Sequence, residues 1–186
     1  WKCTDSKDNK ERIMTTVSTN RDELRQKVAA VLEKSPRRMT SQIARDVQAP
    51  EAEVIRAMSR DKATELDAGQ WERIIRDFEP LGMLHVICNS GCVTLECFGQ
   101  FSHFSTVGEY FNVQNKSLDM HIRYKELASI FAIEKPSHMD GQPTLSIQFY
   151  DRGGRSAFKV FFNFGKKVEP ERVEAFERMC REYALK

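Results

Sequence analysis

Apolar residues in the first part of the chain recur at intervals of three and four, which places their side chains on one face of a helix. Asn20 stands at the expected cap of such a helix, and Glu23 follows at the spacing of a capping box. The helix is expected to end near Pro36, and its stripe consists of Leu24, Val28, Val31 and Leu32. Two shorter stripes follow, one after Thr40 and one after Pro50. The pattern predicts a small bundle of three helices.

A fourth amphipathic segment starts near Asp67 and is stopped by Pro80 and Gly82. Its apolar face consists of Trp71, Ile74, Ile75 and Phe78. From Met83 onward the apolar runs are short, rich in β-branched and aromatic residues, and separated by turn residues. This change predicts strands at 83–88, 92–101, 110–113, 119–123, 128–134, 144–150 and 156–164.

The connections between these strands are too short to hold crossover helices, so the sheet is predicted to be mostly antiparallel. A closing helix is predicted at 169–183, with an apolar stripe of Val173, Phe176, Cys180 and Tyr183. The fold class is therefore α+β: a small N-terminal helical head, a mostly antiparallel multi-stranded sheet, and a C-terminal helix packed on the sheet. We divide the chain into a disordered leader at 1–19, a helical head with a connecting helix at 20–82, and a sheet region with the closing helix at 83–186.

Composition narrows the class of protein. The chain has 186 residues, of which 40% are hydrophobic and 30% charged. It contains no apolar run approaching the ~20 residues of a membrane span, so membrane insertion is not expected. The formal net charge of +2 is too balanced to indicate a nucleic-acid partner. The N-terminus lacks a secretory pattern, and five cysteines are an odd number, so we expect reduced thiols and a cytoplasmic location.

Two patterns suggest other functions. Residues 40–58 have the spacing of a helix-turn-helix, which suggests a transcription regulator, but the second helix begins with Glu51 and Glu53, which DNA phosphates would repel. Nucleic acid is therefore an unlikely partner. At the start of the sheet region lies a series of possible zinc ligands, which consists of His85, Cys88, Cys92 and Cys97. Strand alternation points its members to opposite faces, which argues against one shared zinc ion.

The most informative stretch is YFNVQNKSLDMHIR, residues 110–123. Alternation places Tyr110 on one face of its strand and, on the returning strand, places His121 and Arg123 on one face. If the two strands pair, a phenol, an imidazole and a guanidinium share one side of the sheet. Such a group could ligate ferric iron and hold a carboxylate, which are the two features that haem presents to a protein. The alternative is that these polar residues simply face water.

The block FNVQNKSLDMHIRYKELASIFAIEKP, residues 111–136, resembles the FNVxDxxFNLHLRxDxIAxAWVxxKP block of the HemS/ChuS haem proteins. From about residue 21 to its end the chain resembles the shorter HutX/ChuX family of haem-utilisation carriers. The resemblance implies one half of the two-repeat HemS architecture, with haem (iron protoporphyrin IX) bound at the sheet. Tyr110, His121 and Arg123 match the family's haem-side positions, with His121 and Tyr110 as ligands of the haem iron.

One position departs from the family pattern. HemS-type proteins carry a proximal histidine in an H-[ST]-G motif, where this chain reads Cys97-Phe98-Gly99. Cysteine also ligates haem iron, so Cys97 is a candidate ligand, although it is equally explained as a buried strand residue. His103, in the loop that follows, is a further candidate or else a solvated loop histidine.

The resemblance implies an intracellular haem carrier that accepts haem after uptake and transfers it to a haem acceptor or a haem-degrading protein. Some HemS/ChuS relatives are described as degrading haem, so an enzyme is the alternative, although the chain contains no local catalytic motif. Because a single copy of a two-repeat sheet leaves uncovered edge strands, we expect a homodimer.

Overall fold

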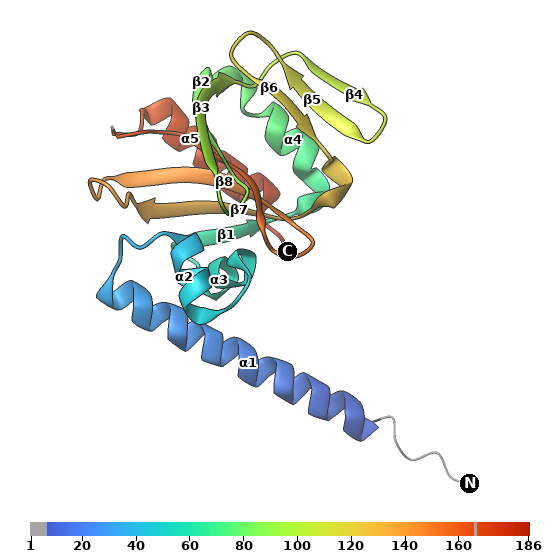
Figure 1. Ribbon diagram of the computed structural model, residues 1–186, viewed down its shortest axis with the longest axis vertical. Coiled ribbons are helices and arrows are strands. Elements are labelled where there is room, and N and C mark those ends of the chain that lie inside the picture. The colour runs from blue at the N-terminus through green and yellow to red at the C-terminus, as the bar shows by residue number, and fades with distance from the viewer. Residues whose placement is uncertain (1–6, 166) are drawn as a thin grey trace.

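The computed structural model describes the backbone of residues 7–165 and 167–186 as two antiparallel sheets with helices at both ends (Figure 1). The larger sheet has six strands in the order β1-β7-β8-β9-β2-β3. Their bounds are Ala63–Leu66, Leu127–Pro136, Pro143–Asp151, Ser156–Phe161, Met83–Asn89 and Thr94–Gln100. The smaller sheet has the order β4-β5-β6, with bounds Phe104–Val107, Tyr110–Gln114 and Asp119–Ile122.

One hydrophobic core lies between the two sheets and two helices, α4 (Trp71–Arg76) and α5 (Pro170–Tyr183). Phe78, just past α4, is fully buried near its centre and makes edge contacts with the rings of Phe101, Phe149 and Phe162. The helix α5 contributes the buried stripe of Phe176, Met179 and Tyr183. This core holds the smaller sheet against the larger one.

A second core joins the helical head to the opposite face of the six-stranded sheet. The head consists of α1 (Lys7–Lys34), α2 (Thr40–Val47) and α3 (Glu51–Ala57), and in Figure 1 it lies beneath β1 and β7. Phe131 and Ile133 of β7 belong to this core, whereas Ile130 and Ala132 belong to the first core. The central part of β7 is therefore buried on both faces, which explains its uninterrupted run of apolar residues.

A nearly buried ion pair connects the head to the sheet. Lys159 Nζ of β9 lies 2.6 Å from Glu51 Oε1 at the start of α3, and the two side chains are only 14% and 10% exposed. Thr40 Oγ1 donates a second hydrogen bond to the same carboxylate oxygen, at 2.5 Å. Close by, the Cβ position of Gly154 would lie 2.7 Å from Pro50 Cβ, so only glycine allows the head to pack this closely on the β8–β9 turn.

The expected α+β class is confirmed, with several corrections to the elements. The predicted sheet is in fact two sheets, and the pattern missed β1 and β4 because their four residues, ATEL and FSTV, do not alternate between apolar and polar. The helix start predicted at Asn20 is wrong, since α1 begins at Lys7 and continues through Asn20. The predicted leader at 1–19 lies partly outside the described residues, and the division of the chain into leader, head and sheet region stays a prediction.

We expect Lys159→Met to destabilise the protein by about 3–5 kcal/mol, because it leaves the Glu51 carboxylate buried without its cation. The double variant Glu51→Gln/Lys159→Met should recover most of this loss, because no uncompensated charge remains. Urea denaturation followed by circular dichroism measures both effects. A double variant no more stable than Lys159→Met would show that the ion pair does not carry the contact.

Candidate functional site

The three-stranded sheet has one apolar and one polar face. Phe111 and Ile122 are opposite one another in the β5–β6 register, and both are buried on the inner face. The ring of Phe111 meets that of Trp71 edge-on at 5.0 Å, and Tyr124 stacks on Trp71 at 4.9 Å. The Arg76 guanidinium lies over the Phe111 ring, 5.4 Å from its centroid. These contacts hold the inner face on α4, so the residues of alternate parity face outward.

A row of three polar side chains crosses the outer face. Ser105 of β4 is opposite Asn112 of β5, and Asn112 is opposite His121 of β6. Asn112 Oδ1 lies 2.8 Å from His121 Nδ1, and Asn112 Nδ2 donates to Ser105 Oγ at 3.2 Å. Asn112 is only 4% exposed, whereas the His121 side chain is 54% exposed. The imidazole is therefore anchored at its inner nitrogen and presented to solvent.

Tyr110 lies beside this row. Its ring is 38% exposed and meets the His121 ring edge-on, with centroids 6.4 Å apart. Arg123 follows the last residue of β6, and its Nη2 lies 3.5 Å from Glu109 Oε2 in the β4–β5 turn. Both members of that pair are more than half exposed, so the guanidinium is available to another anion. The structure thus brings together the phenol and the imidazole that the sequence pattern singled out, with Arg123 just past the strand end.

The other two predicted ligands lie elsewhere. His103 is an exposed residue of the β3–β4 loop with a left-handed backbone (φ 56°), and its Nδ1 is 3.2 Å from Ser102 Oγ. Cys97 is in the six-stranded sheet, opposite Val86, and packs against the first core. The site residues that the sequence missed are Ser105 and Asn112. Ser105 lies on a strand that was not predicted. The sequence indicated Asn112 only through strand alternation, which places it on the same face as Tyr110.

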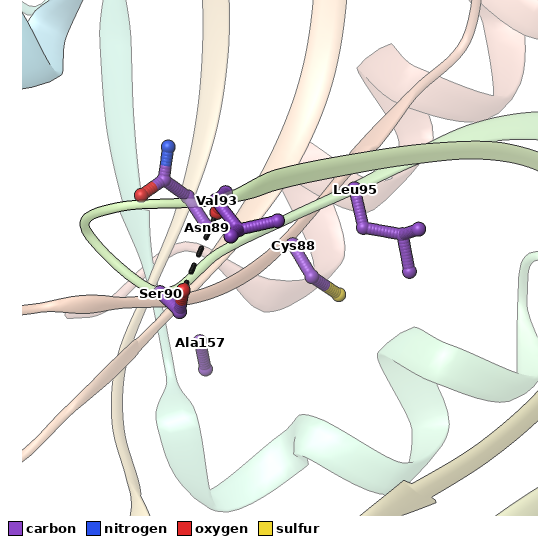
Figure 2. A pocket seen from close by; sticks show the side chains of 6 residues that line it. All are labelled: Cys88, Asn89, Ser90, Val93, Leu95 and Ala157. Carbon is purple, nitrogen blue, oxygen red and sulfur yellow. Dashed lines mark hydrogen bonds between the residues drawn. The ribbon is translucent and has the colours of Figure 1, made fainter.

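A shallow hollow of about 280 Å³ lies under the β2–β3 hairpin (Figure 2). Cys88 and Leu95 are opposite one another in the register and point to the same side of the hairpin. The volume is just below the ~300–1,000 Å³ of typical small-molecule sites. The hollow is lined by Cys88, Asn89, Ser90, Val93, Leu95 and Ala157. Cys97 lies two residues beyond Leu95 on the same strand face, and Cys88 and Cys97 both pack against the first core.

Burial raises the pKa of the Cys88 thiol, and the charge of the neighbouring Cys97 raises it further. Burial also raises the pKa of the Cys97 thiol. Because the thiolate is the form that binds metal, these surroundings oppose ligation by Cys97 at neutral pH. Among the side chains that the structure describes, 20–165 and 167–186, no group of three or more His, Cys, Asp or Glu residues is placed to hold a metal ion. The possible zinc ligands His85 and Cys88 point to opposite faces of β2, since they are three positions apart along the strand.

Residues 64–179 match the model of a protein family described as haem utilisation ChuX/HutX. This match covers more than half of the chain. The chain belongs to the ChuX/HutX family. It is 20% identical to the intracellular haem transport protein HutX of Vibrio cholerae, over 91% of this chain and 89% of that protein.

Solved structures share the fold. The haem-binding protein ChuX superimposes with a TM-score of 0.72 at 21% identity, covering 83% of this chain and 97% of ChuX. The haem-degrading enzyme ChuS of Escherichia coli O157:H7 superimposes with a TM-score of 0.74 at 22% identity, covering 89% of this chain but 47% of ChuS. Both comparisons confirm the architecture expected from the resemblance. Separately, no helix in the described part of the chain is long and apolar enough to cross a membrane.

Among the four cysteines that the structure describes, we expect iodoacetamide at pH 7 to alkylate Cys92 first, because this thiol is exposed in the hairpin turn. Cys88 and Cys97 should react more slowly, because a raised pKa leaves less thiolate, and their labelling should accelerate as the pH rises above 9. Cys180 should be slowest, since burial raises its pKa to about 11. A mass-spectrometric time course measures the rates, and denatured protein is the control. Labelling of Cys97 as fast as Cys92 would reveal a thiolate and restore Cys97 as a candidate ligand.

Proposed function

We propose that this protein binds haem at the outer face of the three-stranded sheet and transfers it to a partner inside the cell. The observation that carries the proposal is the Tyr110 and His121 pair, presented to solvent by a sheet whose other face is fixed on Trp71. Family membership supports it, as does the similarity to HutX, which is named as an intracellular haem transport protein.

The chemistry of this face fits haem as cargo. Imidazole nitrogen and phenol oxygen are both known ligands of haem iron. His121 Nδ1 is already bonded to Asn112, which leaves Nε2 as the atom directed outward. Val107, opposite Tyr110 in the register and 65% exposed, adds apolar surface for a porphyrin ring. Arg123 supplies a cation that could pair with a haem propionate in place of Glu109.

The openness of the site favours a carrier over an enzyme. A carrier has to release haem intact, so ligands on an accessible surface suit it, whereas haem degradation requires oxygen to be held near the ring and water to be excluded. The His121 side chain is more than half exposed. The alternative is a haem-degrading enzyme, because the haem-degrading enzyme ChuS has the same fold.

We expect hemin titration to give a Soret band that saturates at about one haem per chain. His121→Ala and Tyr110→Phe should shift the ferric band or speed haem loss roughly tenfold or more, equivalent to about 1.4 kcal/mol, because each removes a candidate ligand atom. Absorption spectra and transfer of haem to apomyoglobin measure the two effects.

Cys97→Ser and His103→Ala are the matched controls for that titration, because both residues lie away from the Tyr110 and His121 pair. Neither should change the Soret band. A shift in Cys97→Ser alone, with the Tyr110 and His121 variants unchanged, would transfer the proposed ligation to the β2–β3 hairpin. The absence of any Soret band would eliminate haem as the cargo.

Carriage and degradation give different products. We expect the haem-loaded protein, mixed with ascorbate and catalase, to keep its spectrum and to deliver intact haem to an apo-haem acceptor. Catalase removes stray peroxide, which would otherwise destroy haem without any enzyme. Loss of the Soret band despite catalase, with release of iron and a linear tetrapyrrole, would identify an enzyme instead.

We also propose that the protein acts as a homodimer. At one edge of the six-stranded sheet β1 is bridged by Ala184, whereas β3 forms the other edge and, among the described strands, pairs only with β2. Phe98 of β3 is half exposed beside the half-exposed Phe164. Uncovered edges with apolar side chains are normally paired or covered in natural proteins. This chain covers 47% of ChuS, so the ChuS chain is long enough to contain two units of this size.

We expect light scattering to give a dimer mass at micromolar concentration, and Phe98→Glu to shift the protein toward monomer because it places a charge at the proposed interface. Met139→Glu is the matched control, since Met139 is also exposed but lies in the β7–β8 loop. A monomer mass for the unaltered protein would contradict the proposal.

A further inference from the structure

Asn112, which lies behind His121, is buried although it is a polar residue on the outer face of the sheet. Asn112 is 4% exposed, and its amide is hydrogen-bonded on both sides. Its Nδ2 donates to Ser105 Oγ, so the amide oxygen is the atom that faces the imidazole. An oxygen with no hydrogen can only accept, and therefore His121 Nδ1 is the donor in the 2.8 Å contact.

We propose that Asn112 is a positioning residue that keeps the His121 imidazole in its Nδ1–H form, with the lone pair of Nε2 directed outward. The proposal rests on the proposed function, since it assigns Nε2 as the atom that meets the haem iron. The tautomer of a histidine is set by the hydrogen bond that its other nitrogen makes, and such supporting bonds also fix the orientation of the ring. Ser105 supports the amide in turn, which extends the arrangement across all three strands.

One neighbour favours the opposite tautomer. Asp119 Oδ1 lies 3.4 Å from His121 Nε2 and would accept a proton carried there. That contact is longer than the 2.8 Å bond to Asn112, and the Asp119 side chain is 66% exposed. Water competes effectively for an exposed carboxylate, whereas the buried amide oxygen of Asn112 would lose its partner altogether. The buried bond therefore decides the tautomer, and Asp119 is free to turn away when a ligand approaches Nε2.

The first test needs no haem. Nitrogen-15 NMR of the imidazole in the free protein at about pH 8, where histidine side chains are normally neutral, distinguishes protonated from unprotonated ring nitrogens. We expect protonated Nδ1 and unprotonated Nε2 for His121. Asn112→Leu, which keeps the branched shape and removes the acceptor, should abolish this preference. Asn112→Asp should retain it because a carboxylate oxygen takes the place of the amide oxygen, and Asp119→Ala should leave it unchanged.

The second test measures haem. Asn112→Leu should weaken haem binding by about 10–100-fold, the usual effect of removing a partner behind a metal-binding histidine, while Asn112→Asp should restore it. Asp119→Ala is the matched control on the same imidazole and should not weaken binding. Circular dichroism of each variant checks folding, and Ser105→Ala, a smaller change outside the direct contact, should shift the tautomer in the same direction as Asn112→Leu.

The two tests separate the inference from the proposed function. Protonated Nε2 in the unaltered protein, or the same tautomer in Asn112→Leu, would overturn the role of Asn112 even if His121→Ala loses haem. An Nδ1–H imidazole that Asn112→Leu abolishes, together with normal haem binding by His121→Ala, would retain the hydrogen-bond assignment but overturn its role in haem binding.

Discussion

The contact between Trp71 and the inner face of the three-stranded sheet is the interaction on which the displayed site depends. This sheet is small, and strands as short as β4 and β6 are marginal without a surface to pack on. Phe111 meets the indole edge-on and Tyr124 stacks on it, and Phe111 belongs to β5, the central one of the three strands that carry the polar row. Because strand side chains alternate, fixing the apolar face also determines which side chains face outward.

Burial distributes the possible iron ligands between two chemical environments. On the three-stranded sheet, a nearly buried amide holds an imidazole whose other nitrogen is accessible. On the β2–β3 hairpin, the thiols of Cys88 and Cys97 border apolar surface, and burial raises the pKa of each. The first environment presents an imidazole nitrogen to solvent, whereas the second disfavours the thiolate form of a cysteine. The difference arises from packing, since both segments are antiparallel strand pairs.

The helical head shares a hydrophobic core with one face of the six-stranded sheet. Its helix-turn-helix spacing is explained by packing, because the start of α3 is occupied by the ion pair to Lys159 and by the β8–β9 turn at Gly154. Arg56, whose charge would suit a phosphate, pairs with Glu65 and lies over the ring of Phe131. The N-terminal end of a DNA-reading helix has to be free to approach base edges. Here that end faces the protein's own sheet.

The sequence by itself determined the local periodicities, and with them the helices of the head, the closing helix and most strands. It also determined that Tyr110 and His121 would share a face once β5 and β6 paired, because alternation is a property of each strand alone. Only the tertiary structure decided that there are two sheets, that the four-residue strands β1 and β4 complete them, and that Asn112 stands between Ser105 and His121. The residues of β1 and β4 do not alternate between apolar and polar, so these strands are recognised only from the partners that they pair with, β7 and β5. Burial of a polar side chain likewise depends on neighbours from other strands, which no local pattern encodes.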